Sequence, residues 1–389
     1  MKSERTKELR LQLRKNLPAK TFEPQPFYGY TAFAASVTFG VLVVTAHLVS
    51  PPWYVLALLS ILLGQLLAHS AFAAHEAMHG ALFKNKFWSQ LLVYVGYAPY
   101  FFGVETWRAW HVRAHHAHTN KEHLDPDVIG LTKDYRGSLM ARFQETFTIG
   151  SGRWPSILSL FLQFTVQSQI ILWYHGPKWI KRESNKVQFN LFRARTETIC
   201  LAIFWAAVAW SLGGWHSMWL LLFPFLMSNA TFMSYICTQH FLRPLNVHND
   251  PLPNTISVRT YRWLDWIHLY FSYHREHHLF PSMSHSMGPV VRQQMKEMGY
   301  GAPVLTHWQA LKHVLMTPRL YHDSHTLEEK TSGEKTDLVE FWQNIDADEA
   351  DIIQAVPQRG FGEADSTLKP PKPHFAIDKP GEVKQEVTQ

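Results

Sequence analysis

Histidines that occur in short groups are the residues of this chain best suited to chemistry. The sequence has 23 His in 389 residues, and three groups read HEAMH, HVRAHH and HREHH, with a further His at the end of CTQH. These motifs supply nine candidate metal ligands: His75, His79, His111, His115, His116, His240, His274, His277 and His278. Imidazole is a common ligand of transition metals, and the groups therefore predict a metal site.

The spacing and the number of these histidines constrain the site further. His75 and His79 are four residues apart, so both rings would lie on one face of a helix. A catalytic zinc ion takes about three protein ligands, which is far fewer than the chain offers. The surplus predicts two metal ions. Imidazole suits Zn, Cu, Fe and Ni alike, so the ligand type alone does not select the metal.

Long apolar stretches must position these groups. Four of them reach the length of about 20 residues that a membrane-spanning helix needs. They cover about residues 30–49, 53–74, 197–213 and 215–237. Because short connections join the first two stretches and the last two, we predict an all-α integral membrane fold with four transmembrane helices in two hairpins.

Charge sets the predicted orientation of these helices. The two hairpin connections contain no Lys or Arg, whereas residues 1–20 contain seven and residues 178–195 contain six. Loops rich in Lys and Arg stay in the cytoplasm. We therefore predict a multi-pass protein with cytoplasmic N and C termini, and a bacterial inner membrane as its location.

Two further apolar stretches, about 87–103 and 154–174, are interrupted by Gly, Pro, Gln or Ser. If either stretch alone crossed the membrane, the His groups would be divided between its two faces. We therefore expect both to form interfacial or re-entrant helices. All the His groups then lie in one cytoplasmic histidine-rich cap.

Composition divides the chain into three parts. Residues 1–29 form a basic cytoplasmic segment without the apolar core of a cleaved signal peptide, and residues 30–326 form the membrane domain. Residues 327–389 are hydrophilic, and we expect a mostly disordered tail. Only 17% of the residues are charged, which suits a protein partly solvated by lipid. We assign the net charge of +6 to cytoplasmic loops and expect no nucleic-acid partner.

Taken together, the His motifs resemble the three histidine boxes of the membrane fatty acid desaturase family. The boxes of that family are HxxxH, then HxxHH or HxxxHH, then HxxHH, and the resemblance covers about residues 30–290. Thr119-Asn120, Asp125-Pro126-Asp127 and the sequence EHHLFP are also similar to the family. His240 resembles the extra ligand that members carry after the fourth span. Box two departs from many members, because three residues rather than two separate His111 from His115.

The resemblance implies a cofactor, a reaction and partners. The cofactor would be two Fe ions in a non-haem di-iron centre, which activates O2 so that two hydrogens are removed from an acyl chain. The substrate would be a fatty acyl group on a lipid, coenzyme A or a carrier protein, in contact with membrane lipid. The chain lacks the HPGG motif of a fused cytochrome b5 domain, so an external donor such as ferredoxin or cytochrome b5 would supply electrons. No catalytic residue separate from the metal ligands is expected.

Three other functions compete with this interpretation. Membrane hydroxylases or ketolases that act on carotenoids or alkanes use similar boxes. HEAMH also matches the HExxH motif of zinc proteases, in which Glu76 would be the general base, but that reading leaves the other two His groups unexplained. A metal transporter would need polar residues deep within the spans, and the spans contain few.

Several other residues near the boxes could act on or beside the metal ligands. His118 could substitute for a ligand in box two. Asp125, Asp127 and Gln239 could orient ligand rings by bonding their other nitrogen. The remaining histidines, such as His47, His69, His268 and His285, are expected to be packed or solvated side chains.

Overall fold

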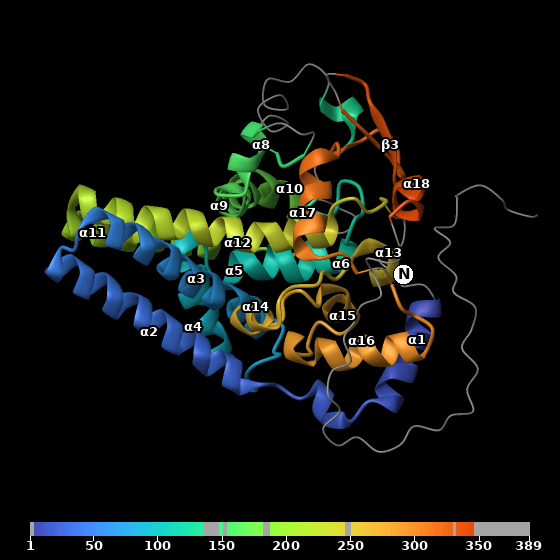
Figure 1. Cartoon of the computed structure of the whole chain (residues 1–389), viewed down its shortest axis with the longest axis horizontal. Coiled ribbons are helices and arrows are strands. Elements are labelled where there is room, and N and C mark those ends of the chain that lie inside the picture. The colour runs from blue at the N-terminus through green and yellow to red at the C-terminus, as the bar shows by residue number, and fades with distance from the viewer. Residues whose placement is uncertain are drawn as a thin grey trace, which may run out of the picture.

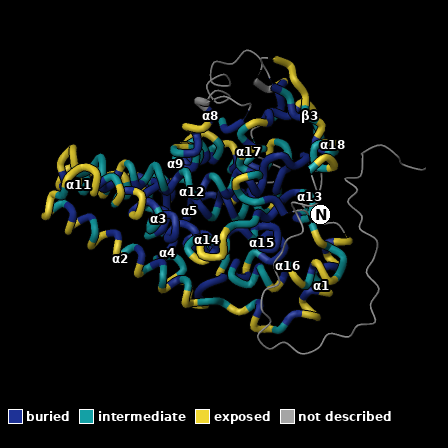
Figure 2. The backbone as a smooth tube through the Cα atoms, in the orientation of Figure 1, coloured by how far each residue is buried: buried dark blue, intermediate teal, exposed yellow. Residues whose placement is uncertain are grey.

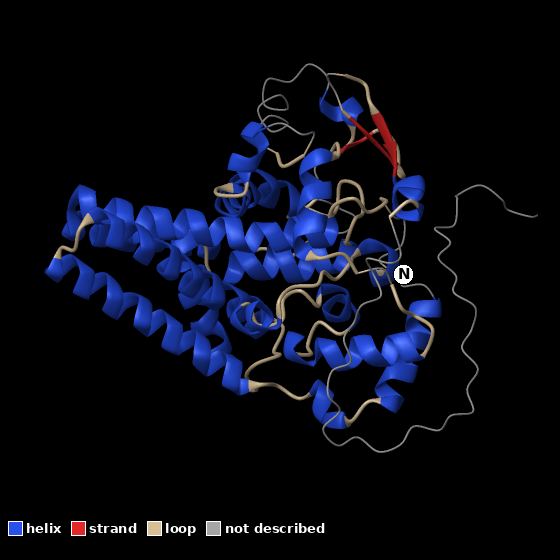
Figure 3. Cartoon of the chain, viewed as in Figure 1, coloured by secondary structure: helices blue, strands red, loops and turns tan. Residues whose placement is uncertain are grey.

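The computed structural model describes residues 4–128, 130–135, 148–150, 154–181, 187–245, 250–302, 304–329 and 332–345. These residues are mostly helical, with one small sheet (Figure 3). Long helices run side by side at one end of the molecule, and shorter helices gather at the other end (Figure 1). The fold is thus an elongated helical stem that carries a cap.

The stem consists of four helices: α2 (Pro26–Val49), α3 (Trp53–Met78), α11 (Leu191–Ser217) and α12 (Phe223–His240). Within the part of the chain that the structure describes, three segments are long and apolar enough to cross a membrane, namely Ala19–Val49, Trp53–Met78 and Leu191–His240. The third has 50 residues and contains both of the predicted spans 197–213 and 215–237. The chain is therefore a membrane protein whose apolar helices match the predicted stretches, with the last two stretches in one helical segment.

Gly213 reverses the direction of this third segment. Its φ of 73° and ψ of 164° are not helical, and glycine adopts such angles without steric cost. In a straight helix Trp205 and Phe225 would be about 30 Å apart. Their ring centroids are instead 4.9 Å apart, and Ser217 Oγ donates to the carbonyl of Ala209. The helices before and after Gly213 therefore form an antiparallel hairpin.

The turns of the two hairpins lie at the same end of the stem. The first turn follows Ser50, which has a left-handed φ of 49°, and two prolines then prevent continuation of α2. His47 and His216 come from the two hairpins, and their Nδ1 atoms are 3.2 Å apart. The opposite ends of α3 and α12 consequently lie together in the cap.

Close packing around α3 fixes its position in the stem. A Cβ at Gly64 would lie 2.7 Å from Met227 Cβ on α12, and a Cβ at Gly96 would lie 2.3 Å from the Ser70 carbonyl. Gly96 belongs to α4 (Lys86–Tyr97), so α4 and α12 both approach the backbone of α3 closely. The last two turns of α3 are buried, whereas α2 exposes much of its surface (Figure 2).

The cap and the connections are built from short elements. The helices are α1 (Glu4–Asn16), α5 (Val104–Trp107), α6 (His116–His118), α8 (Trp154–Ser159), α9 (Gln163–Ile170), α10 (Gly176–Trp179), α13 (Pro251–Asn254), α14 (Arg262–Ile267), α15 (His274–Leu279), α16 (Gly288–Glu297), α17 (His307–Met316) and α18 (Leu338–Gln343). The described residues also form the π-helices η3 (Arg108–His115), η5 (Ile171–His175) and η6 (Met218–Leu222). The 3-10 turns among them are η1 (Ala19–Phe22), η2 (Ala98–Tyr100), η4 (Thr132–Tyr135) and η7 (His285–Met287). Strands β1 (Leu320–Tyr321), β2 (Thr326–Glu328) and β3 (Lys335–Asp337) form an antiparallel sheet in that order.

The two interrupted apolar stretches form broken helices. Residues 87–103 contain α4, which gives way to the η2 turn at Ala98 and Pro99, and the described residues of 154–174 are divided among α8, α9 and η5. Among the described residues, neither stretch forms a continuous helix of spanning length. Their fragmented course follows the Gly, Pro, Gln and Ser residues that interrupt the apolar pattern.

Ordered structure extends beyond the expected start of the tail at residue 327. Strand β3 and helix α18 follow it, and Leu338 is fully buried. Trp342 Nε1 donates to the carbonyl of Leu242 at 2.7 Å. These apolar side chains anchor a segment whose overall composition is hydrophilic, which is why composition placed the boundary too early. Residues 346–389 lie outside the described part of the chain.

Candidate metal centre

Five of the nine predicted ligands form a first group at the junction of stem and cap. Each residue of this group offers one ring nitrogen, and these five nitrogens all lie within 4.8 Å of one another: His75, His79, His111, His116 and His277. His116 Nε2 is 3.0 Å from His111 Nε2 and 3.2 Å from His277 Nε2. Four imidazole nitrogens bound tetrahedrally to one ion at 2.0–2.1 Å would be roughly 3.3 Å apart. These spacings suit a shared metal ion.

The other four predicted ligands form a second group beside the first. His115, His240 and His278 each offer a ring nitrogen within 4.8 Å of the others. His274 Nε2 joins them, at 2.7 Å from His240 Nε2 and 3.1 Å from His278 Nε2. The rings of His116 and His278 stack at 4.4 Å across the boundary between the groups. All nine residues therefore come together as two adjacent groups.

Helix ends supply most of these side chains. His75 and His79 lie on one face where α3 ends, and His240 is the last residue of α12. His274, His277 and His278 come from the single short helix α15. Since α3 and α12 pack against each other in the stem, their ends bring the first box and His240 to the same place.

The π-helix η3 explains the unusual spacing of box two. In a π-helix the backbone bonds from residue i+5 to residue i, and the backbone N–H of His116 indeed bonds to the His111 carbonyl. This wider turn brings His111 and His116, five residues apart, into the first group. His115 then points into the second group. The additional residue in the box is thus accommodated by a local change of helix type.

The histidine groups contain buried nitrogen atoms that need a partner. Both ring nitrogens of His75 have no hydrogen bond among the described residues, and neither does Nε2 of His79 or of His115. An unsatisfied buried polar atom costs about 1–3 kcal/mol. Burial and the neighbouring imidazoles lower the pKa of His111 and His277 well below the usual range, so these rings are neutral, the form that binds metals. The clusters are compatible with a metal centre.

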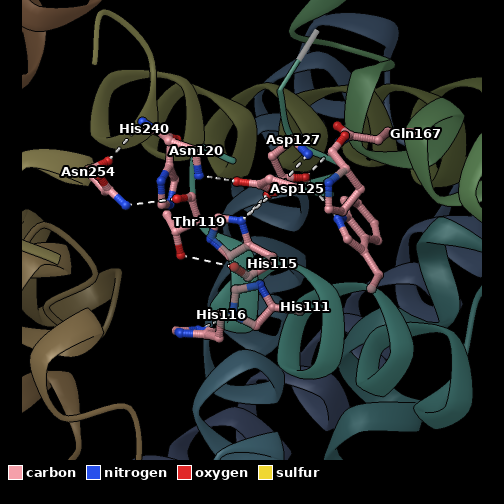
Figure 4. A network of polar contacts seen from close by, with 12 residues as sticks. His111, His115, His116, Thr119, Asn120, Asp125, Asp127, Gln167, His240 and Asn254 are labelled. Atoms are coloured by element: carbon pink, nitrogen blue, oxygen red, sulfur yellow. Dashed lines mark hydrogen bonds and ion pairs between the residues drawn. The ribbon is translucent and has the colours of Figure 1, made fainter. Parts of the chain in front are cut away.

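Two carboxylates orient His115, as Figure 4 shows. Asp125 Oδ1 is 3.0 Å and Asp127 Oδ2 3.1 Å from His115 Nδ1. Burial alone would lower the pKa of His115, but the two carboxylates raise it to about 9. Trp110 and Gln167 donate to Asp127 and hold it in place. With Nδ1 engaged in this way, Nε2 of His115 is the ligand atom, and a metal ion that binds there displaces the Nε2 proton.

Glu76 does not adopt the role that a zinc-protease motif would require. Its Oε1 is 3.2 Å from His285 Nδ1, and its Oε2 accepts a hydrogen bond from the backbone N–H of His285. The carboxylate is thus engaged by a residue outside HEAMH. This arrangement argues against Glu76 as a general base for a metal-bound water.

Three further residues lie near the boxes. Among the described residues, His118 joins neither group. The Gln239 amide donates to the backbone carbonyl of Phe271. Trp107, which the motifs do not indicate, stacks on His111 with ring centroids 4.3 Å apart and planes 9° apart. The aromatic-rich sequence before box two is the only signal that could have suggested this contact.

Buried histidines outside the boxes are packed, as expected. His69 Nδ1 is 2.6 Å from the Ile267 carbonyl, and His268 lies between Tyr235 and Gln65. His285 differs, because its buried ring stacks on His277 at the edge of the first group.

The family model described as fatty acid desaturase matches residues 51–310 of the chain. The chain belongs to the fatty acid desaturase family. The matched residues include all three histidine boxes and His240. As a fatty acid desaturase, the chain is an oxidoreductase with a fatty acyl substrate, and it uses O2.

Curated relatives of this fatty acid desaturase are distant in sequence, and the matches cover between 60% and 82% of this chain. The sn-1 oleoyl-lipid 12-desaturase of Synechocystis sp. is 23% identical over 82% of this chain and 91% of its own length. The chloroplastic omega-6 fatty acid desaturase of Spinacia oleracea is 23% identical over 79% of this chain and 68% of its own. The Delta(5) fatty acid desaturase fat-4 of Caenorhabditis elegans is 25% identical over 60% of this chain and 55% of its own.

Proposed function

We propose that this desaturase holds two iron ions in its histidine groups and introduces a double bond into an acyl chain with electrons from an external donor. The observation that carries this proposal is the pair of adjacent, mostly buried, nitrogen-only donor groups. The nine histidines are then the metal ligands. Iron accounts for the redox chemistry, which zinc does not provide.

The proposed reaction removes one hydrogen from each of two neighbouring carbons. With O2 as oxidant, two further electrons and two protons enter, and both oxygen atoms leave as water. The bound irons would supply the O2 activation, as cofactors do in demanding oxidations. The protein side chains hold the centre and exclude water from it: Trp107 stacks on His111, and Phe271 lies 5.0 Å from His75. Glu76 is bonded to His285, which supports a centre without a separate protein base.

We further propose that the stem crosses the membrane four times, with both termini and the cap in the cytoplasm. His75 at the end of α3 and His240 at the end of α12 belong to neighbouring groups. The chain must therefore return to the same side between them. The antiparallel hairpin at Gly213 supports two crossings within Leu191–His240. The broken helices at 87–103 and 154–174 support an interfacial placement of both stretches.

An acidic electron donor such as ferredoxin or cytochrome b5 is the proposed partner. The exposed side chains of α1 include Arg5, Lys7 and Lys15, and this helix packs against Leu279 and Phe280, which directly follow box three. A basic surface near the metal groups would raise the rate of encounter with an acidic protein. A bacterial inner membrane is the proposed location.

Expression in a bacterial host with a simple lipid profile tests the proposed activity. Total fatty acids would be analysed by gas chromatography and mass spectrometry. The unaltered chain should yield a new double bond, and His277→Ala should yield none. The matched control is His322→Ala, because His322 is exposed and outside both groups. A new double bond with His277→Ala, or hydroxylated products from the unaltered chain, would contradict the proposal.

A further inference from the structure

Glu76 and His285 form a buried carboxylate–imidazole pair directly beside the first histidine group. The two residues are 1% and 0% exposed. Glu76 Oε1 lies 3.2 Å from His285 Nδ1, and Glu76 Oε2 accepts the backbone N–H of His285 at 3.3 Å. Two contacts from one carboxylate fix the ring and the backbone of His285 together. The pair also ties the end of α3 to the η7 turn that follows α15.

The ring of His285 lies flat against that of His277. Their centroids are 4.4 Å apart and their planes differ by 14°. Phe271 is also nearly parallel to His285, at 5.0 Å and 28°. Stacked aromatic rings in a close-packed interior restrict one another's rotation. The plane of His277 is therefore set in part by the plane of His285.

His277 needs such support more than His115 does. A metal-bound histidine is usually oriented through a hydrogen bond at its second ring nitrogen. His115 has this bond, because Asp125 and Asp127 face its Nδ1. His277 Nδ1 is buried and has no hydrogen bond among the described residues. The stacked ring of His285 is the contact that can take over this function.

We infer that Glu76 and His285 are positioning residues, which hold the ring of His277 in the orientation that binds the first metal ion. Glu76 anchors His285 by accepting its backbone N–H and by lying against the ring, with Oε1 3.2 Å from Nδ1, and His285 orients His277 by stacking. The inference rests on the proposed function, in which His277 is a metal ligand. It also gives the acidic residue of HEAMH a role other than that of a general base.

Two matched pairs of variants separate positioning from simple packing. Glu76→Gln keeps an oxygen that accepts from His285, whereas Glu76→Met has a similar size and no such oxygen. In the Glu76→Gln background, His285→Phe keeps a flat ring against His277, whereas His285→Gln removes the ring. Because neither double variant leaves an unpaired buried carboxylate, both should fold.

Purified full-length protein would be titrated with Co(II), whose ligand-field absorption reports coordination geometry without any need for turnover. Glu76→Met and the double variant with His285→Gln should bind one of two Co(II) ions about tenfold or more weakly, with shifted bands. The matched variants, Glu76→Gln and the double variant with His285→Phe, should bind Co(II) with an affinity within about threefold of that of the unaltered chain. His268→Gln alters a different buried imidazole and should lower only the thermal unfolding midpoint.

The outcomes distinguish failure of this inference from failure of the proposed function. If the unaltered chain binds two Co(II) ions and all four variants match its affinity and spectrum, Glu76 and His285 are packing residues and the inference is overturned. If the unaltered chain binds no Co(II), the metal centre itself is refuted and the inference falls with it. A loss confined to the variants without the oxygen or the ring supports the positioning role.

Discussion

At the scale of single residues, the contacts of each imidazole ring decide how firmly a candidate ligand is held. His115 is fixed by two carboxylates, and His277 is fixed by stacking on His285. The nine candidate ligands could be predicted from sequence, because motif spacing is a local property. The contact between Glu76 and His285 could not, since 209 positions separate these residues. No local pattern encodes a pairing over such a distance.

Asp125→Asn and Asp127→Asn should each weaken metal binding by about 10–100-fold. An amide can present its NH2 group to His115 Nδ1, which would place the ring proton on Nε2 and block the ligand atom. Iron per protein would be measured after gel filtration in a buffer that contains a weak chelator. Glu334→Gln alters an exposed carboxylate and is the matched control. Iron retention in both aspartate variants equal to that of the control would show that these carboxylates do not orient His115.

At the scale of elements, helix type and helix ends bring the ligands together. The apolar stretches predicted long helices that the structure also contains, with Gly213 at the break between the last two. They could not predict the π-helix η3, because a change in backbone hydrogen bonding from i+4 to i+5 leaves no mark on hydropathy. Hydropathy also could not predict β3 and α18, because the segment that forms them is hydrophilic overall and contains only a few apolar residues.

Gly213→Ala should destabilise the second hairpin, whereas Gly214→Ala should not. Neither added Cβ meets another atom within 4 Å, so crowding does not distinguish the two variants. Gly213 alone has a left-handed φ, of 73°, which costs a residue with a side chain about 1–3 kcal/mol. The midpoint of thermal unfolding in detergent, followed by tryptophan fluorescence, should fall for Gly213→Ala only. Equal midpoints for the two variants would contradict the strained turn.

Gly96→Ala should disturb the stem beside the metal groups. Its Cβ would lie 2.3 Å from the Ser70 carbonyl and 2.6 Å from Ala74 Cβ, the residue before His75. Overpacking of this kind typically costs about 1–3 kcal/mol. We expect a lower unfolding midpoint and less bound iron. Gly40→Ala, where nothing lies within 4 Å, should lower neither quantity, because alanine is more favourable than glycine inside a helix. A parent-like midpoint for Gly96→Ala would mean that α3 and α4 can separate at no cost.

At the scale of the whole molecule, the distribution of histidines along the stem argues for an even number of crossings. His47 and His216 meet at the hairpin turns, and the nine candidate ligands meet at the other end. The sequence predicted that the candidate ligands lie at the cytoplasmic end of the stem, because Lys and Arg are concentrated in the segments on that side. The three-dimensional arrangement adds that the ring centroids of His240 and His115 are 4.6 Å apart. Two residues this close cannot lie on opposite sides of a membrane.

Cysteine labelling distinguishes four crossings from three. In a Cys200→Ser background, which leaves only the buried Cys237, single cysteines would be placed at Lys7, Ser50 and Glu334. With four crossings, a membrane-impermeant maleimide added to intact cells should label Ser50→Cys only, and the other two sites should react only after permeabilisation. If Leu191–His240 crossed once, Glu334→Cys would react in intact cells together with Ser50→Cys. The two histidine groups could then not share one face of the membrane, so labelling at Glu334 tests the arrangement of the metal centre as well as the number of crossings.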